Sequence, residues 1–265
     1  MLKRLRLKLL GTMLVVPATL VASAAPAWAH YVYKQAMVFI SDPLCVYNRS
    51  EVSHGGGGGY SEVYTSTWRF AGIGPVGKEC GVMKWQAAGS IGVWGRFYKK
   101  TGSKWSICTY WNWKNNSGTT YQVKLSWDYG SRPPCGDGYY ATMGASRARD
   151  GSGRWRCSAA GSKCRTIWSG SHKLVRAGLQ PVADPPVEEP SWVGADGLVD
   201  LDKLPAQLPL IDAGGNPALD ASGNPILVNT IPSIDDPDQP DDSTVVRGVT
   251  EDGIETIQTP GTRAA

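Results

Sequence analysis

Apolar and polar residues alternate between positions 121 and 127, as expected for a β-strand that buries one of its two faces. The apolar positions of this run are Tyr121, Val123, Leu125 and Trp127. Similar runs rich in Tyr, Trp, Val and Thr recur from residue 30 to residue 178, separated by Gly, Asn, Ser and Pro, and none has a helical period. The pattern predicts an all-β domain, specifically an antiparallel β-sandwich.

Two turn motifs set the register expected for the central strands. Gly102-Ser103 fits a two-residue type II′ turn. The pairs expected around it are Thr101–Lys104, Lys100–Trp105, Tyr98–Ile107, Phe97–Cys108, Arg96–Thr109 and Trp94–Trp111. Asn116-Ser117-Gly118 fits a three-residue hairpin loop, which would add the strand at 121–127 to the same sheet.

This register gathers aromatic residues on one face of the sheet, which is either a core face or a sugar-binding platform. The aromatic positions are Trp94, Tyr98, Trp105, Trp111 and Trp113. The opposite face carries polar residues, which favours the core interpretation for Trp111 and Trp113. A buried, unpaired arginine is costly, so we expect Arg96 to be paired or to lie at the lip of a cleft. The candidate glycan-binding residues are Trp94, Arg96, Tyr98 and Trp105.

A second hairpin motif is rich in arginine. Asp150-Gly151-Ser152-Gly153 separates two pairs of arginines, and a loop of two or four residues would place all of them on one face. These side chains are either separately solvated or form an anion-binding site, because arginine binds phosphate and carboxylate through paired hydrogen bonds. The candidate anion-binding residues are Arg147, Arg149, Arg154 and Arg156.

Charge divides the chain near residue 178. Residues 30–179 contain 20 Lys/Arg and 7 Asp/Glu, whereas residues 180–265 contain 3 Lys/Arg and 16 Asp/Glu. We therefore expect a basic β domain over 30–178, followed by an acidic, Pro- and Asp-rich tail over 179–265. The tail has no aromatic residue after Trp192, so we expect it to be largely disordered. Its charge also makes it a candidate partner for the basic domain, in competition with anionic ligands.

The N-terminus and the cysteines predict secretion. Residues 1–29 have the basic start, apolar middle and small-residue end of a signal peptide, and we expect no membrane-spanning segment near the C-terminus. An even number of cysteines in a secreted chain predicts three disulfides. The residues are Cys45, Cys80, Cys108, Cys135, Cys157 and Cys164. Sequence alone leaves several pairings open, and we favour neighbours in order.

Cleavage after Ala27-Trp28-Ala29 would make His30 the first residue of the mature protein. This start resembles that of the lytic polysaccharide monooxygenases, which are secreted β-sandwiches that begin with histidine. The resemblance implies a copper ion held by the terminal amine, the ring of His30 and a second histidine. The second histidine would be His54 or His172.

Other catalytic signals are few. The chain lacks G-x-S-x-G and H-E-x-x-H motifs, and the seven carboxylates of the basic domain include no close pair in sequence. With its Ala-rich signal peptide, the chain resembles secreted proteins of unknown function that are common in Gram-positive bacteria. We expect a monomeric, non-catalytic protein without cofactor that binds an anionic polymer or glycan, such as a cell-wall polymer, at the cell surface. The alternatives are a secreted toxin or inhibitor, and a copper oxidase acting on polysaccharide.

Overall fold

The computed structural model describes most of the chain after residue 29. The described residues are 30–41, 43–55, 58–75, 77–130, 132–159, 163–175, 187–241 and 243–258. They form strands, turns and loops without a helix, which confirms the all-β prediction. The expected signal peptide, residues 1–29, lies outside this part of the chain.

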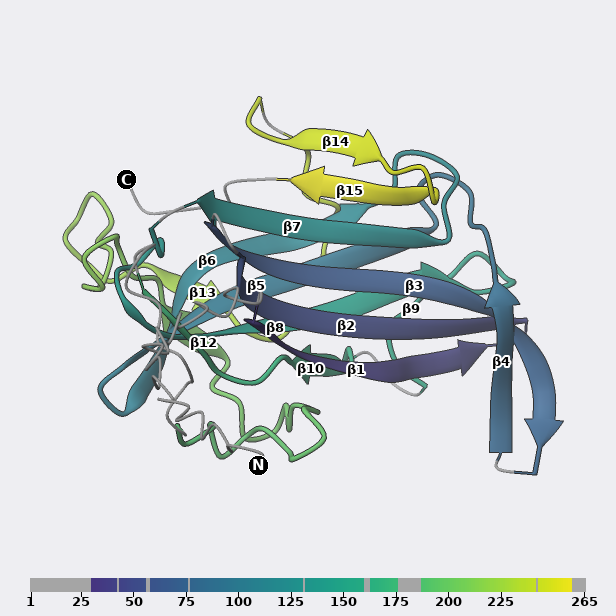
Figure 1. Ribbon diagram of the computed structural model, residues 1–265, viewed down its shortest axis with the longest axis horizontal. Helices are drawn as coiled ribbons and strands as arrows, with labels where there is room; N and C mark the ends of the chain where they lie inside the picture. The colour runs from purple at the N-terminus through teal and green to yellow at the C-terminus, as the bar shows by residue number, and fades with distance from the viewer. Residues whose placement is uncertain are drawn as a thin grey trace, which may run out of the picture.

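The strands form two large sheets and one small one (Figure 1). The first sheet has the order β1-β2-β3-β7-β15-β14, with β4 paired to β3. Its strands are β1 (His30–Ser41), β2 (Leu44–Gly55), β3 (Gly58–Gly74), β4 (Gly77–Met83), β7 (Gln122–Gly130), β14 (Val246–Val249) and β15 (Ile254–Gln258).

The second sheet has the order β10-β8-β5-β6, with β9 and β11 also paired to β8. Its strands are β5 (Ile91–Thr101), β6 (Lys104–Asn115), β8 (Gly138–Arg149), β9 (Trp155–Arg156), β10 (Thr166–Trp168) and β11 (His172–Leu174). The small sheet pairs β12 (Gln207–Pro209) with β13 (Leu227–Asn229).

The two large sheets share an apolar core. Trp127 on β7 packs against Phe97 on β5 and Trp111 on β6, with ring centroids 4.9 Å and 5.8 Å apart. Polar side chains also join the sheets, because Ser61 and Thr142 share a hydrogen bond of 2.8 Å. Apolar surface buried between the sheets is the main source of their stability.

The predicted turn at Gly102-Ser103 is confirmed, but the register predicted beyond it holds for only part of the hairpin. Tyr98 pairs with Ile107 as expected, whereas a bulge shifts the next pair to Phe97–Thr109. The prediction that Arg96 faces Thr109 and Trp94 faces Trp111 is therefore wrong, since Arg96 pairs with Tyr110 and Gly95 with Trp111. The bulge adds Cys108 to the inner core and places Trp111 there too, while Trp94 packs in a separate cluster.

The predicted hairpin at Asn116-Ser117-Gly118 is wrong. β6 and β7 belong to different sheets, so the connection between them crosses from one sheet to the other. Asn116 shapes this crossing: its side-chain oxygen accepts hydrogen bonds from the amides of Ser90 and Ile91, and its nitrogen donates to the carbonyl of Ala87. The alternation along β7 is nevertheless correct, because Val123, Leu125 and Trp127 point into the core.

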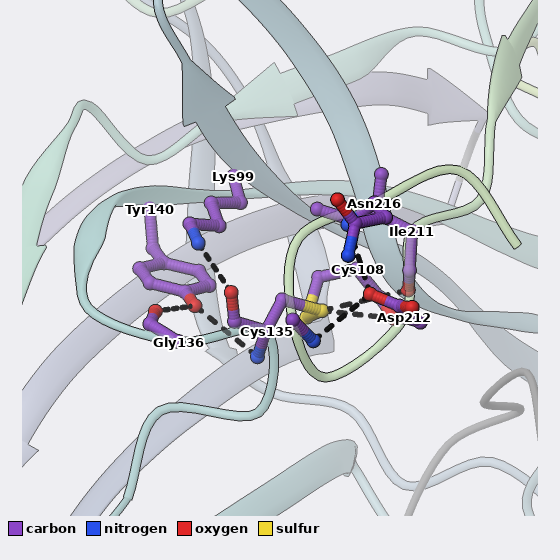
Figure 2. Close-up of a disulfide and its surroundings, with 9 residues drawn as sticks. Lys99, Cys108, Cys135, Gly136, Tyr140, Ile211, Asp212 and Asn216 are labelled. Carbon is purple, nitrogen blue, oxygen red and sulfur yellow. Dashed lines mark hydrogen bonds between the residues drawn. A yellow bond between two sulfur atoms is a disulfide. The ribbon is translucent and has the colours of Figure 1, made fainter.

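The three predicted disulfides are present and join neighbouring cysteines in order. The bridges are Cys45–Cys80, Cys108–Cys135 and Cys157–Cys164, and every cysteine is used. Figure 2 shows the Cys108–Cys135 bridge between Lys99, whose amine donates to the Cys135 carbonyl, and the turn at Asp212. Among the described residues, no helix is long and apolar enough to cross a bilayer.

The expectation of a largely disordered tail is wrong for residues 187–241 and 243–258, which we call the acidic segment. It contains four strands, and β15 pairs in parallel with β7, so the first sheet is not purely antiparallel. Its buried residues include Trp192, Leu204, Leu210, Val228 and Ile257. The segment can bury so much surface because the outer face of the second sheet supplies the aromatic rings that it lacks.

Candidate functional site

The candidate glycan-binding residues of the second sheet are covered by the acidic segment. Trp94, Tyr98 and Trp105 are at most 8% exposed. They form one apolar cluster with residues of the segment, including Trp192 and Leu210. The structure therefore brings the predicted residues together, but in a buried layer and not on an open platform.

Arg96 is buried and paired, one of the two states expected for it. Its guanidinium donates to the carbonyl oxygens of Gly95 and Trp111 and, at 2.9 Å, to that of Asn229 in the acidic segment. It also stacks on Trp94, with 3.9 Å between the guanidinium carbon and the ring centroid. Burial lowers the pKa of Arg96 to about 9, because desolvation disfavours the charged form.

The arginine hairpin forms, but it does not place four arginines on one face. Arg149 pairs with Trp155 and Ala148 with Arg156, so the loop 150–154 has an odd number of residues and sends Arg156 to the other face. Asp150 stabilises this five-residue loop by accepting hydrogen bonds from the amides of Ser152 and Arg154. The expectation of a shared face was wrong because it assumed an even loop.

The arginines of this hairpin also differ in exposure. Arg149 and Arg154 are exposed, whereas Arg147 is 2% exposed and donates to the carbonyls of Ile234 and Asp236. Burial lowers the pKa of Arg147 to about 10. Arg147 is thus held by the acidic segment, while Arg149 and Arg154 face solvent.

The histidines are divided between the two sheets. The register between β1 and β2 places His30 directly opposite His54, whereas His172 lies on β11 opposite Tyr140. Of the two expected partners of His30, only His54 is its neighbour. Among the described side chains, no group of three or more metal-ligating residues occurs.

A different polar surface lies on the outer face of the first sheet, and we call it the tyrosine face. Strand register aligns its residues in adjacent rows across β1, β2, β3 and β7. Its members are Tyr31, Tyr33, Arg49, Glu51, Tyr60, Glu62, Tyr64 and Lys124. Sequence reasoning missed this face, although Tyr60, Glu62 and Tyr64 alternate with residues that point inward.

Two carboxylates lie at the centre of the tyrosine face. Glu51 on β2 is directly opposite Glu62 on β3, and their side chains are 4% and 9% exposed. Glu51 accepts hydrogen bonds from Arg49 and, at 2.7 Å, from the Tyr60 hydroxyl. Like charges opposite one another on a sheet are destabilising, so each carboxylate needs its own donors.

Glu62 has an equivalent set of partners. It accepts hydrogen bonds of 2.8 Å from Lys124 and from the Ser126 hydroxyl, and another from the Tyr64 hydroxyl. One cation therefore neutralises each carboxylate, and the centre of the face carries no net charge. Burial and the neighbouring carboxylates raise the pKa of Tyr60 and Tyr64 above the usual value, which keeps both hydroxyls protonated as donors.

Exposed aromatic rings flank this polar centre. Tyr31 and Tyr33 are 47% and 45% exposed, and their rings stack with centroids 5.5 Å apart. The guanidinium of Arg49 lies 4.1 Å from the Tyr33 ring centroid and 5.4 Å from that of Tyr64. Cation–π contacts of this kind hold the rings in place. The face thus combines positioned rings with fixed hydrogen-bonding groups.

No protein-family model matches this chain, and no curated protein or solved structure shows significant similarity to it.

Proposed function

We propose that the protein is a secreted, non-catalytic binding protein for a glycan at the cell surface, and that the tyrosine face is its binding site. The observation that carries this proposal is the pair of stacked, half-exposed rings of Tyr31 and Tyr33 beside the Glu51–Glu62 centre. Tyrosine offers an apolar ring and a polar hydroxyl, which suits the apolar faces and hydroxyl groups of a sugar. Binding sites commonly combine apolar walls with a few fixed polar groups.

The charge of the tyrosine face favours a neutral glycan over a polyanion. Arg49 and Lys124 are the cations of the face, and each is paired with a carboxylate. Binding to a phosphate chain would need free cations, whereas the apolar ring faces of Tyr31 and Tyr33 can stack on a sugar without any charge. We therefore expect binding that changes little with salt.

We infer two further features that accompany this function. The shared core of the two large sheets supports a β-sandwich architecture. Three disulfides fit an oxidising, extracellular location reached through cleavage of residues 1–29.

Co-sedimentation with insoluble glycans tests the proposal. The secreted protein would be mixed with purified bacterial cell walls, chitin and cellulose, and the bound fraction measured at low and high salt. Tyr31→Ala/Tyr33→Ala should weaken binding by at least about tenfold, or about 1.4 kcal/mol. Ile73→Ala/Val82→Ala is the matched control, since these residues are also exposed but lie elsewhere in the first sheet. Equal binding by both variants, or binding abolished by salt, would contradict the proposal.

The neighbouring His30 and His54 support a second candidate, a copper-dependent oxidase acting on polysaccharide. If cleavage exposes His30, its amine and ring together with the ring of His54 are the groups that would hold the copper ion, which would supply redox chemistry. Mass spectrometry of the secreted protein would establish the first residue. Titration with Cu²⁺ followed by electron paramagnetic resonance should then show a bound signal that His54→Ala alters and His172→Ala leaves unchanged. No difference between these two variants would exclude this copper site.

A further inference from the structure

Two buried cations on the second sheet are covered by one loop of the acidic segment. Residues 233–241, which we call the acidic loop, lie against Lys114 and Arg147 without forming a strand. Lys114 is 1% exposed, and its amine donates at 2.8 Å to the carbonyls of Gln239 and Pro240 and to a carboxylate oxygen of Asp241.

The loop lies along the edge of β6. The side-chain oxygens of Gln239 and Asp238 accept the amide hydrogens of Asn112 and Asn115, at 3.1 Å and 2.9 Å. The amide of Gln239 donates to the carbonyl of Trp113 at 2.7 Å. The loop therefore pairs with a sheet edge that would otherwise present free hydrogen-bonding groups.

Arg147 is held beneath the loop by neutral acceptors, whereas Lys114 pairs with the carboxylate of Asp241. Arg147 donates to the carbonyls of Ile234 and Asp236 and to the side-chain oxygen of Asn115, none of which is charged. Burying a cation without a close anion carries a large desolvation cost. Phosphate oxygens would bind the same guanidinium with charge-assisted hydrogen bonds, which are about twice as strong as neutral ones.

The row of cations continues beyond the loop. Trp155 lies between Arg147 and Arg149, at 4.4 Å and 4.5 Å from their guanidinium carbons. Arg149 is exposed, and its partners among the described residues are the backbone carbonyls of Gly89 and Gly153. An anionic chain could contact Arg149 first and reach Arg147 by displacing the loop, a local opening that leaves the strands intact.

We propose that the acidic loop occupies a binding groove for a phosphate-bearing polymer, in which Arg147 and Arg149, which share one face of β8, contact successive phosphates once the loop moves aside. Four aspartates of the loop, at positions 235, 236, 238 and 241, supply the negative charge that the polymer replaces. The groove lies on the second sheet and is independent of the glycan site proposed on the first. Inorganic polyphosphate and glycerol-phosphate polymers share this chemistry.

Fluorescence anisotropy with labelled polyphosphate on the full chain tests the groove at about 50 mM salt, where phosphate contacts are strong. Asp236→Asn/Asp238→Asn/Asp241→Asn keeps one side-chain acceptor oxygen at each position and removes three charges. This variant should bind at least about tenfold more tightly than wild type, and Arg147→Gln in the same background should reverse the gain. The control is Asp220→Asn/Glu251→Gln/Asp252→Asn, which removes the same charge from exposed positions outside the loop. Equal gains in both triple variants would overturn the proposal, because net charge alone would then explain binding.

Hydrogen exchange on the wild-type chain gives a second test that needs no variant. Polyphosphate should speed amide exchange at Asn112 and Asn115, whose partners are in the loop. Unchanged exchange at saturating polymer would overturn the groove. A parallel titration with a glycerol-phosphate polymer shows whether the groove accepts a cell-wall-type chain or inorganic phosphate alone. Loss of the tyrosine face by Tyr31→Ala/Tyr33→Ala should leave these measurements unchanged.

Discussion

Arg147 stacks on Trp113, with 4.5 Å between its guanidinium carbon and the ring centroid, and Trp155 lies on its other side at 4.4 Å. The guanidinium is therefore held between two indoles while its nitrogens bond to the acidic segment. A lysine would keep the charge but lose the planar stacking and most of the hydrogen bonds. We predict that Arg147→Lys lowers the free energy of unfolding by about 2–4 kcal/mol in urea denaturation. Arg154→Lys, at an exposed position, should change it by less than about 0.5 kcal/mol.

The sequence was sufficient to predict the all-β class of residues 30–178 and the three disulfides, but not how the strands are assembled. The type II′ turn at Gly102-Ser103 fixed the register as far as Tyr98, and the bulge that adds Cys108 changed it from Phe97 onward. A bulge depends on packing against the opposite sheet and leaves no local turn signal. The hairpin predicted at Asn116 is wrong for a related reason, since a hairpin and a connection that crosses between sheets can use the same turn residues.

The acidic segment shows a second limit of prediction from sequence, which is that composition alone does not reveal the surface that a segment packs against. Judged by its own composition, it lacks the aromatic residues needed for a core, and disorder was the reasonable expectation. Its partner surface supplies them: Trp168, for example, packs against Trp192 and donates a hydrogen bond to Glu189. The tyrosine face could have been found, because Glu51 and Glu62 occupy outward positions of alternating strands, but their pairing required the register of β2 and β3.

Alkaline pH should destabilise the fold. Burial raises the pKa of five tyrosines, namely Tyr60, Tyr64, Tyr98, Tyr129 and Tyr140, so above pH 10 the unfolded chain loses protons that the native state keeps. Burial also lowers the pKa of Arg96, Arg147 and Lys99, which acts in the opposite direction, but the five tyrosines outnumber these three cations. We therefore predict that the free energy of unfolding falls as the pH rises above 10.

Urea denaturation at pH 8, 10 and 11 would measure this slope. Tyr140→Phe removes one of the five groups and should make the decrease of the free energy of unfolding with pH shallower. A free energy of unfolding that stays constant or rises above pH 10 would show that these tyrosines are not protected in the native state.

The three disulfides should contribute unequally to stability. They span 35, 27 and 7 positions of sequence, for Cys45–Cys80, Cys108–Cys135 and Cys157–Cys164 in turn. The chain-entropy relation gives about 4, about 3.5 and about 2.5 kcal/mol, because a longer loop restricts the unfolded chain more. Paired Cys→Ser variants, compared by thermal unfolding, should follow this order. A larger loss for Cys157–Cys164 would mean that native-state packing outweighs loop length.

Gly144 marks a close approach of the two sheets. A Cβ atom at this position of β8 would lie 2.3 Å from the Cγ1 atom of Val63 and 2.7 Å from the Ser50 hydroxyl oxygen. We predict that Gly144→Ala costs about 1–3 kcal/mol, since the sheets would have to separate. Gly118→Ala is the matched control, because nothing lies within 4 Å of a Cβ there. Similar melting temperatures for the two variants would contradict this packing.

Glu255 links the acidic segment to the crossing between the sheets. Its carboxylate is 1% exposed and accepts hydrogen bonds from the amides of Ser117 and Gly118 and from Arg247. Removing it leaves the two amides without this acceptor and Arg247 with Asp241 as its remaining carboxylate partner, so Glu255→Ala should lower the free energy of unfolding by about 2–4 kcal/mol. Glu255→Gln should lower the free energy of unfolding by less, because one acceptor oxygen remains. The exposed Glu251→Ala serves as control, and equal stability of the Glu255→Ala and Glu251→Ala variants would mean that the acidic segment unfolds independently of the two sheets.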